Sequence, residues 1–189
     1  MNTHQKFMKC QEELLLKHIR FFKGEQPGVG YLDIASVVSP HMVNMTAYDG
    51  MKSLFDKHSY DTIVAVEGDA WLYAQPLALE YGKEIVLARR LSGLPYRAIC
   101  EDYQSPQGTR TLELEANKLD ANGKVLIVNS VIATGQMTAA LVRLVQRTGA
   151  RLVGVAALAS LDYLPRGVFQ LPADVPVRAV LHYDKPPEA

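Results

Sequence analysis

Short apolar segments that alternate with helix-like segments constrain the fold of this chain more than any other feature. Strands that read as continuous apolar runs are buried on both faces, and their alternation with helices is typical of a parallel sheet. The sequence therefore predicts an α/β domain with a parallel central sheet flanked by helices. The expected strands are Thr62–Val66, Glu84–Ala88, Lys124–Val128, Leu152–Ala159 and Val177–Leu181, and the expected helices among them are Ala70–Tyr81 and Gly135–Arg147.

One stretch departs from this alternation. Tyr96–Cys100 and Thr109–Glu115 alternate apolar and polar residues with a period of two, on either side of the polar segment 101–108. Period-two patterns around a polar loop predict an antiparallel hairpin. We expect the tip of this hairpin to be exposed and mobile.

The N-terminal part has its own pattern. Lys6–Phe22 is predicted to be a helix, a loop with Pro27 and Gly28 follows, and Tyr48–His58 is predicted to be a second helix. A length of 189 residues fits one domain with a real core. We expect N-terminal helices and a hood-like segment over 1–58, a core over 59–183 and a short tail over 184–189.

Composition excludes several classes of protein. Hydrophobic residues make up 48% of the chain and charged residues 21%, which is typical of a globular protein. Twenty basic residues balance twenty acidic ones, so electrostatics gives no reason to expect nucleic acid or an anionic membrane as a partner. No apolar run approaches the ~18 residues that cross a bilayer. Cys10 and Cys100 have no metal-ligand spacing, and we expect both to be free and buried in a cytoplasmic protein.

The segment Val125–Thr138, with the sequence VLIVNSVIATGQMT, carries the clearest chemical signal. A buried strand leads through a short loop into a helix, which points backbone N–H groups and the positive end of the helix dipole at one spot. Gly135 permits close approach of an anion, and Thr134 and Thr138 can add hydroxyl hydrogen bonds. Taken alone, the pattern fits an ordinary strand-to-helix turn with a threonine cap equally well.

This segment resembles the phosphoribosyl pyrophosphate signature of type I phosphoribosyltransferases, in which a strand and two acidic residues precede A-T-G-G-T. Other segments are similar to motifs of the adenine and xanthine branch, in the same order along the chain. They are Pro27–Val38 (PGVGYLDIASVV), Val66–Trp71 (VEGDAW), Ala88–Pro95 (ARRLSGLP) and Asp102–Glu113 (DYQSPQGTRTLE).

The resemblance implies transfer of a phosphoribosyl group to a purine, with release of pyrophosphate and with Mg²⁺ as the cofactor. It implies small-molecule ligands and a homodimer, for which the Leu14–Leu16 run is a candidate interface. The implied site consists of a phosphate-binding loop (Ala133, Thr134, Gly135, Gln136, Met137, Thr138), ribose-binding Asn129 and Ser130, a pyrophosphate side (Asp69, Arg89, Arg90) and base-binding Tyr31 and Asp162.

Several of these positions depart from the family pattern. Asn129 and Ser130 replace the paired acids, and each lost charge-assisted hydrogen bond is worth roughly 1.5–3 kcal/mol. Asp69 replaces an arginine, and a carboxylate ~4 Å from a phosphate oxygen is repelled by about 4 kcal/mol at an effective dielectric of 20. Pro106 replaces a glutamate in the hairpin and has no group to give or take a proton, so no catalytic residue is assigned. No metal ligand is assigned either.

These departures favour a diverged protein that binds a nucleotide or phosphoribosyl ligand through the 133–138 loop and has lost transferase activity. An active, Mg²⁺-dependent purine phosphoribosyltransferase of the adenine or xanthine type is the alternative. A structural subunit that pairs with an active relative is a third interpretation. Within the site, we expect Asp69 to pair with Arg89 or Arg90.

Overall fold

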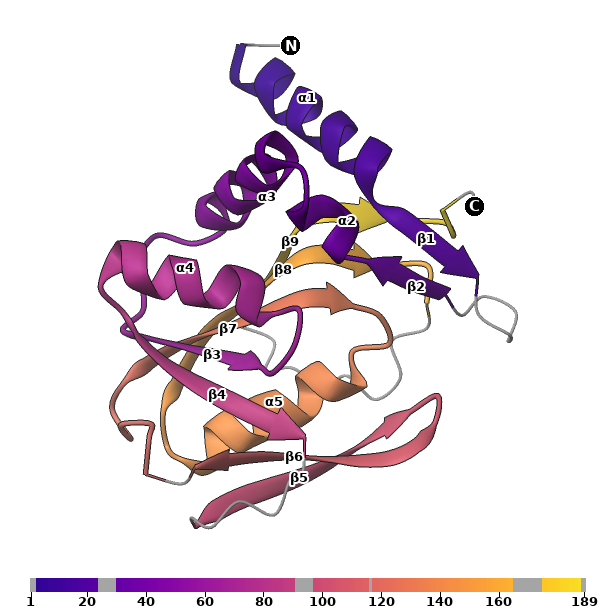
Figure 1. The fold of residues 1–189 in the computed structure, drawn as a ribbon. Helices are drawn as coiled ribbons and strands as arrows, with labels where there is room; N and C mark the ends of the chain where they lie inside the picture. Colours follow the sequence, from indigo (N-terminus) through magenta and orange to yellow (C-terminus); the bar gives the residue numbers. More distant parts are fainter. Residues whose placement is uncertain (1–2, 24–29, 91–96, 116, 165–174, 188–189) are drawn as a thin grey trace.

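The computed structural model describes residues 3–23, 30–90, 97–115, 117–164 and 175–187 (Figure 1). Its helices are α1 (Thr3–His18), α2 (Ala35–Val38), α3 (His41–Ser53), α4 (Trp71–Tyr81) and α5 (Gln136–Arg147). Its strands are β1 (Arg20–Lys23), β2 (Gly30–Asp33), β3 (Thr62–Val66), β4 (Glu84–Arg90), β5 (Ala98–Ser105), β6 (Gly108–Glu115), β7 (Lys124–Ile132), β8 (Arg151–Leu161) and β9 (Val177–Tyr183).

The central sheet has the strand order β5-β6-β4-β3-β7-β8-β9 (Figure 1). β3 is parallel to β4 and β7, and β8 is parallel to β7 and β9. β6 pairs antiparallel with β4 and β5, which adds a hairpin to one edge of the sheet. The predicted α/β class, with a mostly parallel sheet and an antiparallel hairpin, is confirmed.

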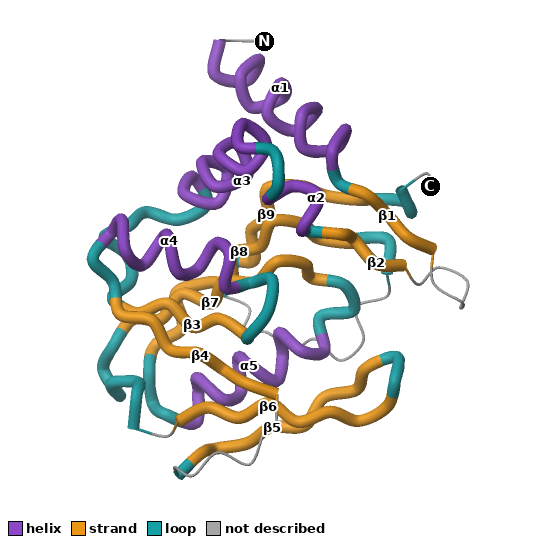
Figure 2. Tube along the Cα trace, in the orientation of Figure 1, coloured by secondary structure: helices purple, strands orange, loops and turns teal. Residues whose placement is uncertain are grey.

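Helices cover both faces of the sheet, with α3 and α4 on one side and α5 on the other (Figure 2). Residues 125–128 of β7 show why a central strand contains a run of apolar residues. Leu126 and Val128 belong to the core beneath α3 and α4, while Val125 and Ile127 belong to the core beneath α5. Because both faces of the strand are buried, every residue in this run is apolar.

A small two-stranded sheet, β1–β2, replaces the end of the expected first helix. The prediction of a helix through Phe22 is wrong, because α1 ends at His18 and residues 20–23 pair with residues 30–33. Arg20 Nη2 lies 2.5 Å from Asp33 Oδ2, which ties the two strands together. The Phe21 ring packs over Gly30, where a Cβ atom would lie only 2.0 Å from Phe21 Cζ.

The second predicted helix, Tyr48–His58, is misplaced. α3 begins at His41 and ends at Ser53. Pro40 has an extended backbone (φ −78°, ψ 118°) and starts the helix earlier than the apolar pattern suggests. After the helix, Asp56 Oδ1 accepts a hydrogen bond from the backbone N–H of His58, which forms a turn instead of another helical turn.

The hairpin is longer than predicted. Most of the expected loop 101–108 is strand, and only Pro106 and Gln107 remain between β5 and β6. Cross-strand hydrogen bonds between polar side chains explain the difference, because the Thr111 hydroxyl donates to Asp102 Oδ1 and the Gln104 amide donates to Thr109 Oγ1. Tyr96, at the predicted start, lies outside the described residues.

Two further expectations concern exposure. Cys10 and Cys100 are free as expected but exposed, contrary to the prediction of burial. Cys100 lies on β5, the edge strand of the sheet, which accounts for its exposure. Among the described helices, none is long and apolar enough to cross a membrane.

Candidate functional site

The junction between β7 and α5 forms a cradle of main-chain donors. Gly135, at the N-cap of α5, has φ 78° and ψ −2°, a left-handed conformation that favours glycine. The first N–H groups of a helix have no partner within the helix, and in α5 they follow directly on this turn. The six predicted phosphate-loop residues, 133–138, all line one hollow of about 130 Å³.

The hairpin forms the opposite wall of this hollow. Tyr103, Gln104, Ser105 and Pro106 line it together with the loop. The geometry of an anion cradle therefore supports the predicted phosphate-binding site, while the identity of its ligand stays a prediction.

Asn129 and Ser130 lie within β7 and not after its end, because the strand continues to Ile132. Asn129 is only 1% exposed, and its Nδ2 donates a hydrogen bond to Thr138 Oγ1 at 2.9 Å. Its Oδ1 atom is buried without a hydrogen-bond partner. Asn129 thus orients the first turn of α5, and Ser130, which is partly exposed, is the more accessible of the two predicted ribose residues.

The turn after β3 arranges the pyrophosphate side differently from expectation. Glu67 and not Asp69 engages Arg90, since Glu67 Oε1 accepts from the Arg90 backbone N–H and the Glu67 carbonyl accepts from Arg90 Nη1 at 3.3 Å. Within the described residues, no ion pair of 4.0 Å or less joins Asp69 to Arg89 or Arg90. The predicted pairing of Asp69 is wrong.

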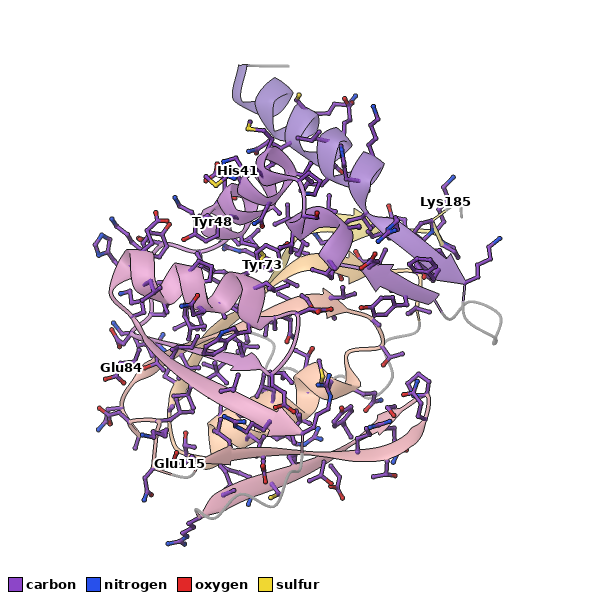
Figure 3. The ribbon with its side chains drawn as sticks, viewed as in Figure 1. His41, Tyr48, Tyr73, Glu84, Glu115 and Lys185 are labelled. Atoms are coloured by element: carbon purple, nitrogen blue, oxygen red, sulfur yellow. The ribbon has the colours of Figure 1, made fainter. Side chains whose placement is uncertain are left out.

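Asp69 instead lies beside two tyrosines. Partial burial and then the charge of Asp69 raise the pKa of the Tyr31 hydroxyl, and the same two causes raise the pKa of Tyr73. Tyr73 points from α4 into the core, where its hydroxyl has no hydrogen-bond partner (Figure 3). Tyr31, on β2, is 57% exposed, so its ring is accessible to a planar ligand as the base-binding prediction requires.

Asp162, the second predicted base-binding residue, is held by the ends of β8 and β9. Its Oδ1 accepts a hydrogen bond from Ser160 Oγ at 2.6 Å, and its Oδ2 lies 2.7 Å from His182 Nδ1. Sequence reasoning missed His182, because the contact depends on the parallel register that places Ser160 opposite His182. No local pattern reports this register.

The described part of the chain offers no ready-made metal site. It contains no group of three or more His, Cys, Asp or Glu residues that could hold a metal ion. A Mg²⁺ ion usually binds through substrate phosphates and at most one or two carboxylates. The side chains of the described residues therefore do not form a site for a resident metal ion.

Comparison with known proteins decides the family. The chain is 34% identical over 139 residues to the adenine phosphoribosyltransferase of Thermotoga neapolitana, a match that covers 74% of this chain and 82% of that protein. The chain belongs to the adenine phosphoribosyltransferase family. The adenine phosphoribosyltransferase of Caldicellulosiruptor saccharolyticus is 29% identical over 164 residues, which are 87% of each chain.

Solved structures of adenine phosphoribosyltransferases agree with this assignment. The enzyme from Rhodothermus marinus has a TM-score of 0.82 and 32% identity, over 92% of this chain and 99% of that one. The Saccharomyces cerevisiae enzyme, crystallised with adenine and an imino-altritol bisphosphate, has the same fold with a TM-score of 0.82 and 24% identity. No protein-family model matches the chain. The relatives support the sequence-based alternative, an active purine phosphoribosyltransferase, better than the diverged protein without transfer activity.

Proposed function

We propose that this protein is a purine phosphoribosyltransferase that transfers a phosphoribosyl group from phosphoribosyl pyrophosphate to adenine. The observation that carries the proposal is the main-chain cradle at Gly135, which faces the β5–β6 hairpin across one hollow. Membership of the adenine phosphoribosyltransferase family supports the choice of reaction and base.

In this reaction, the bond between ribose C1 and the pyrophosphate oxygen breaks, a bond from C1 to a purine nitrogen forms, and the proton of that nitrogen is released with the pyrophosphate. The 5′-phosphate binds to the N–H groups that follow Gly135, where the positive end of α5 favours an anion. This contact fixes the ribose end of the substrate, and positioning of this kind can supply about 7–11 kcal/mol of the reduction in barrier.

Ser130 and Pro106 contribute little chemistry to the bonds that break and form. Ser130 is partly exposed and can hydrogen-bond a ribose hydroxyl, but it carries no charge. Pro106 has no group that donates or accepts a proton, so the hairpin contributes by covering the hollow and excluding water. Catalysis by this protein therefore depends on positioning and on contacts to the leaving group.

The test is pyrophosphate release from phosphoribosyl pyrophosphate and Mg²⁺, measured with adenine, guanine, hypoxanthine and xanthine in turn. We expect release that depends on adenine and stops when Mg²⁺ is chelated. Gly135→Val should abolish release, whereas Gly82→Val, which alters another left-handed glycine (φ 60°) at the far end of α4, should leave it intact in folded protein.

A folded protein that gives no release with any of the four bases would contradict the proposal. Adenosine monophosphate should then be titrated into the same preparation by calorimetry. Binding without release would identify the protein as a nucleotide-binding relative that has lost transfer activity.

A further inference from the structure

A second hollow lies on the hairpin, beyond the carboxyl end of β4. It has a volume of about 310 Å³ and is lined by Arg90, Gln107, Thr109, Arg110 and Thr111. Each of these side chains can donate hydrogen bonds, and the two guanidinium groups stay charged at any physiological pH. A hollow with such a lining is suited to an oxyanion.

The strand register brings the two arginines together. Arg90 is opposite Leu112 in the β4–β6 pair, and Arg110 lies two residues before Leu112 on β6, so both side chains project from the same face of the sheet. Diagonal neighbours of this kind are about 7–8 Å apart, which long side chains can span. One ligand can therefore contact both guanidinium groups.

The same register links this hollow to the phosphate cradle. Arg110 is directly opposite Tyr103 in the β5–β6 pair, and Tyr103 lines the hollow that contains the 133–138 loop. The two hollows are thus adjacent along the hairpin. A ligand with phosphate groups at both ends of a ribose matches this arrangement.

Local contacts prepare Arg90 for such a ligand. The Glu67 carbonyl accepts a hydrogen bond from Arg90 Nη1. A Cβ atom added at Gly68, which has φ 107°, would lie 3.9 Å from the same nitrogen. The Arg90 guanidinium therefore lies beside main chain that carries no side chain at Gly68. Neither Arg90 nor Arg110 is in an ion pair of 4.0 Å or less with a described residue. Two acids are bonded to the described lining of this hollow: Asp102 Oδ1 accepts from the Thr111 hydroxyl, and Glu67 Oε1 accepts from the Arg90 backbone N–H.

The negative charge of Asp69 explains why a diphosphate would need additional positive charge nearby. A carboxylate on the turn after β3 repels a diphosphate, and it is not neutralised by Arg89 or Arg90. We infer that Arg110, together with Arg90, binds the diphosphate group of the substrate and the pyrophosphate that leaves. The inference rests on the proposed transfer reaction and names the residue that supplies the missing positive charge.

The test measures pyrophosphate binding directly, by calorimetry with Mg²⁺ present, in the wild-type protein and in Arg110→Gln. The loss of one charge-assisted contact should weaken binding roughly tenfold to a hundredfold. Arg97→Gln is the matched control, because Arg97 is an exposed arginine that precedes the same hairpin at its opposite end. Arg110→Lys should keep part of the affinity, since it retains the charge but loses the bidentate geometry.

Unchanged pyrophosphate affinity in Arg110→Gln, equal weakening in Arg97→Gln, or no measurable binding of pyrophosphate to the wild-type protein would each overturn the inference. Adenine-dependent transfer by the same preparations separates this failure from failure of the proposed function. Wild-type transfer with an unaltered KM for phosphoribosyl pyrophosphate in Arg110→Gln would reject the role of Arg110 and leave the reaction in place.

Discussion

Arg143 Nε lies 2.5 Å from Glu101 Oε1, and this ion pair fastens α5 to the hairpin. Arg147, one turn further along α5, contacts the other carboxylate oxygen at 3.2 Å and donates to the Cys100 carbonyl at 2.6 Å. Because α5 begins at the main-chain cradle, the same helix positions the cradle at one end and the hairpin along its side. The two walls of the hollow are therefore mechanically connected.

Glu101→Gln tests this connection. We expect faster hydrogen exchange over residues 98–115 and a several-fold higher KM for phosphoribosyl pyrophosphate, with kcat less affected, because the hairpin would lose its fixed position. The free energy of unfolding should fall by no more than about 1 kcal/mol, since the three side chains are partly exposed. Glu84→Gln, on the exposed start of β4 (Figure 3), is the control, and equal kinetic effects in both variants would contradict the expectation.

Gly135→Ala should weaken binding of adenosine monophosphate, as measured by calorimetry. An L-residue in the left-handed conformation costs roughly 1–2 kcal/mol, so the N-cap should shift and the cradle N–H groups should turn away from the phosphate. Gly123→Ala provides a comparison at a turn whose glycine does not have a positive φ. Wild-type affinity in Gly135→Ala would mean that the cradle does not bind the phosphate.

Asp69→Asn should lower the KM for phosphoribosyl pyrophosphate, because it removes a repulsive charge that neither Arg89 nor Arg90 neutralises. A gain of up to about 4 kcal/mol is the upper bound at an effective dielectric of 20 and ~4 Å, and a several-fold change in KM is the practical expectation. Asp49→Asn, an equal charge change on the exposed side of α3, should have no effect. An unchanged KM in Asp69→Asn would place Asp69 away from the diphosphate.

Thr138→Val should destabilise the fold as measured by chemical denaturation. The substitution keeps the shape but removes the acceptor of the Asn129 amide, and a buried unpaired donor costs about 1–3 kcal/mol. Thr46→Val removes an exposed hydroxyl bond to Met42 and should cost much less. Equal losses in the two variants would show that the Asn129–Thr138 bond is not a special contact.

Sequence patterns predicted those elements whose burial is uniform. Thr62–Val66 is apolar because both faces of β3 are covered, and its bounds are the predicted ones. β7 was cut short at Val128 because Asn129 and Ser130 are polar, although one is buried through a hydrogen bond to Thr138. Burial by hydrogen bonding leaves no hydrophobic period for a sequence analysis to detect.

The site was predictable to the extent that its parts are local. The cradle is encoded by consecutive residues, and the structure gathers all six of them in one hollow. The contacts of Asp69 and Asp162 were not predictable, because each depends on which distant side chain the sheet register brings near. Glu67 accepts a hydrogen bond from Arg90, and His182 on β9 contacts Asp162 at the end of β8.

The left-handed turn at Gly135 has an evolutionary consequence. A cradle that offers main-chain N–H groups does not depend on the side chains of Gln136 or Met137, so these residues can vary without loss of the proposed phosphate contacts. The geometry of this site then depends on one glycine, Gly135, and on the direction of one helix, α5. Under the proposed function, related proteins can differ at most of the side chains around this site and still bind a phosphate group in the same way.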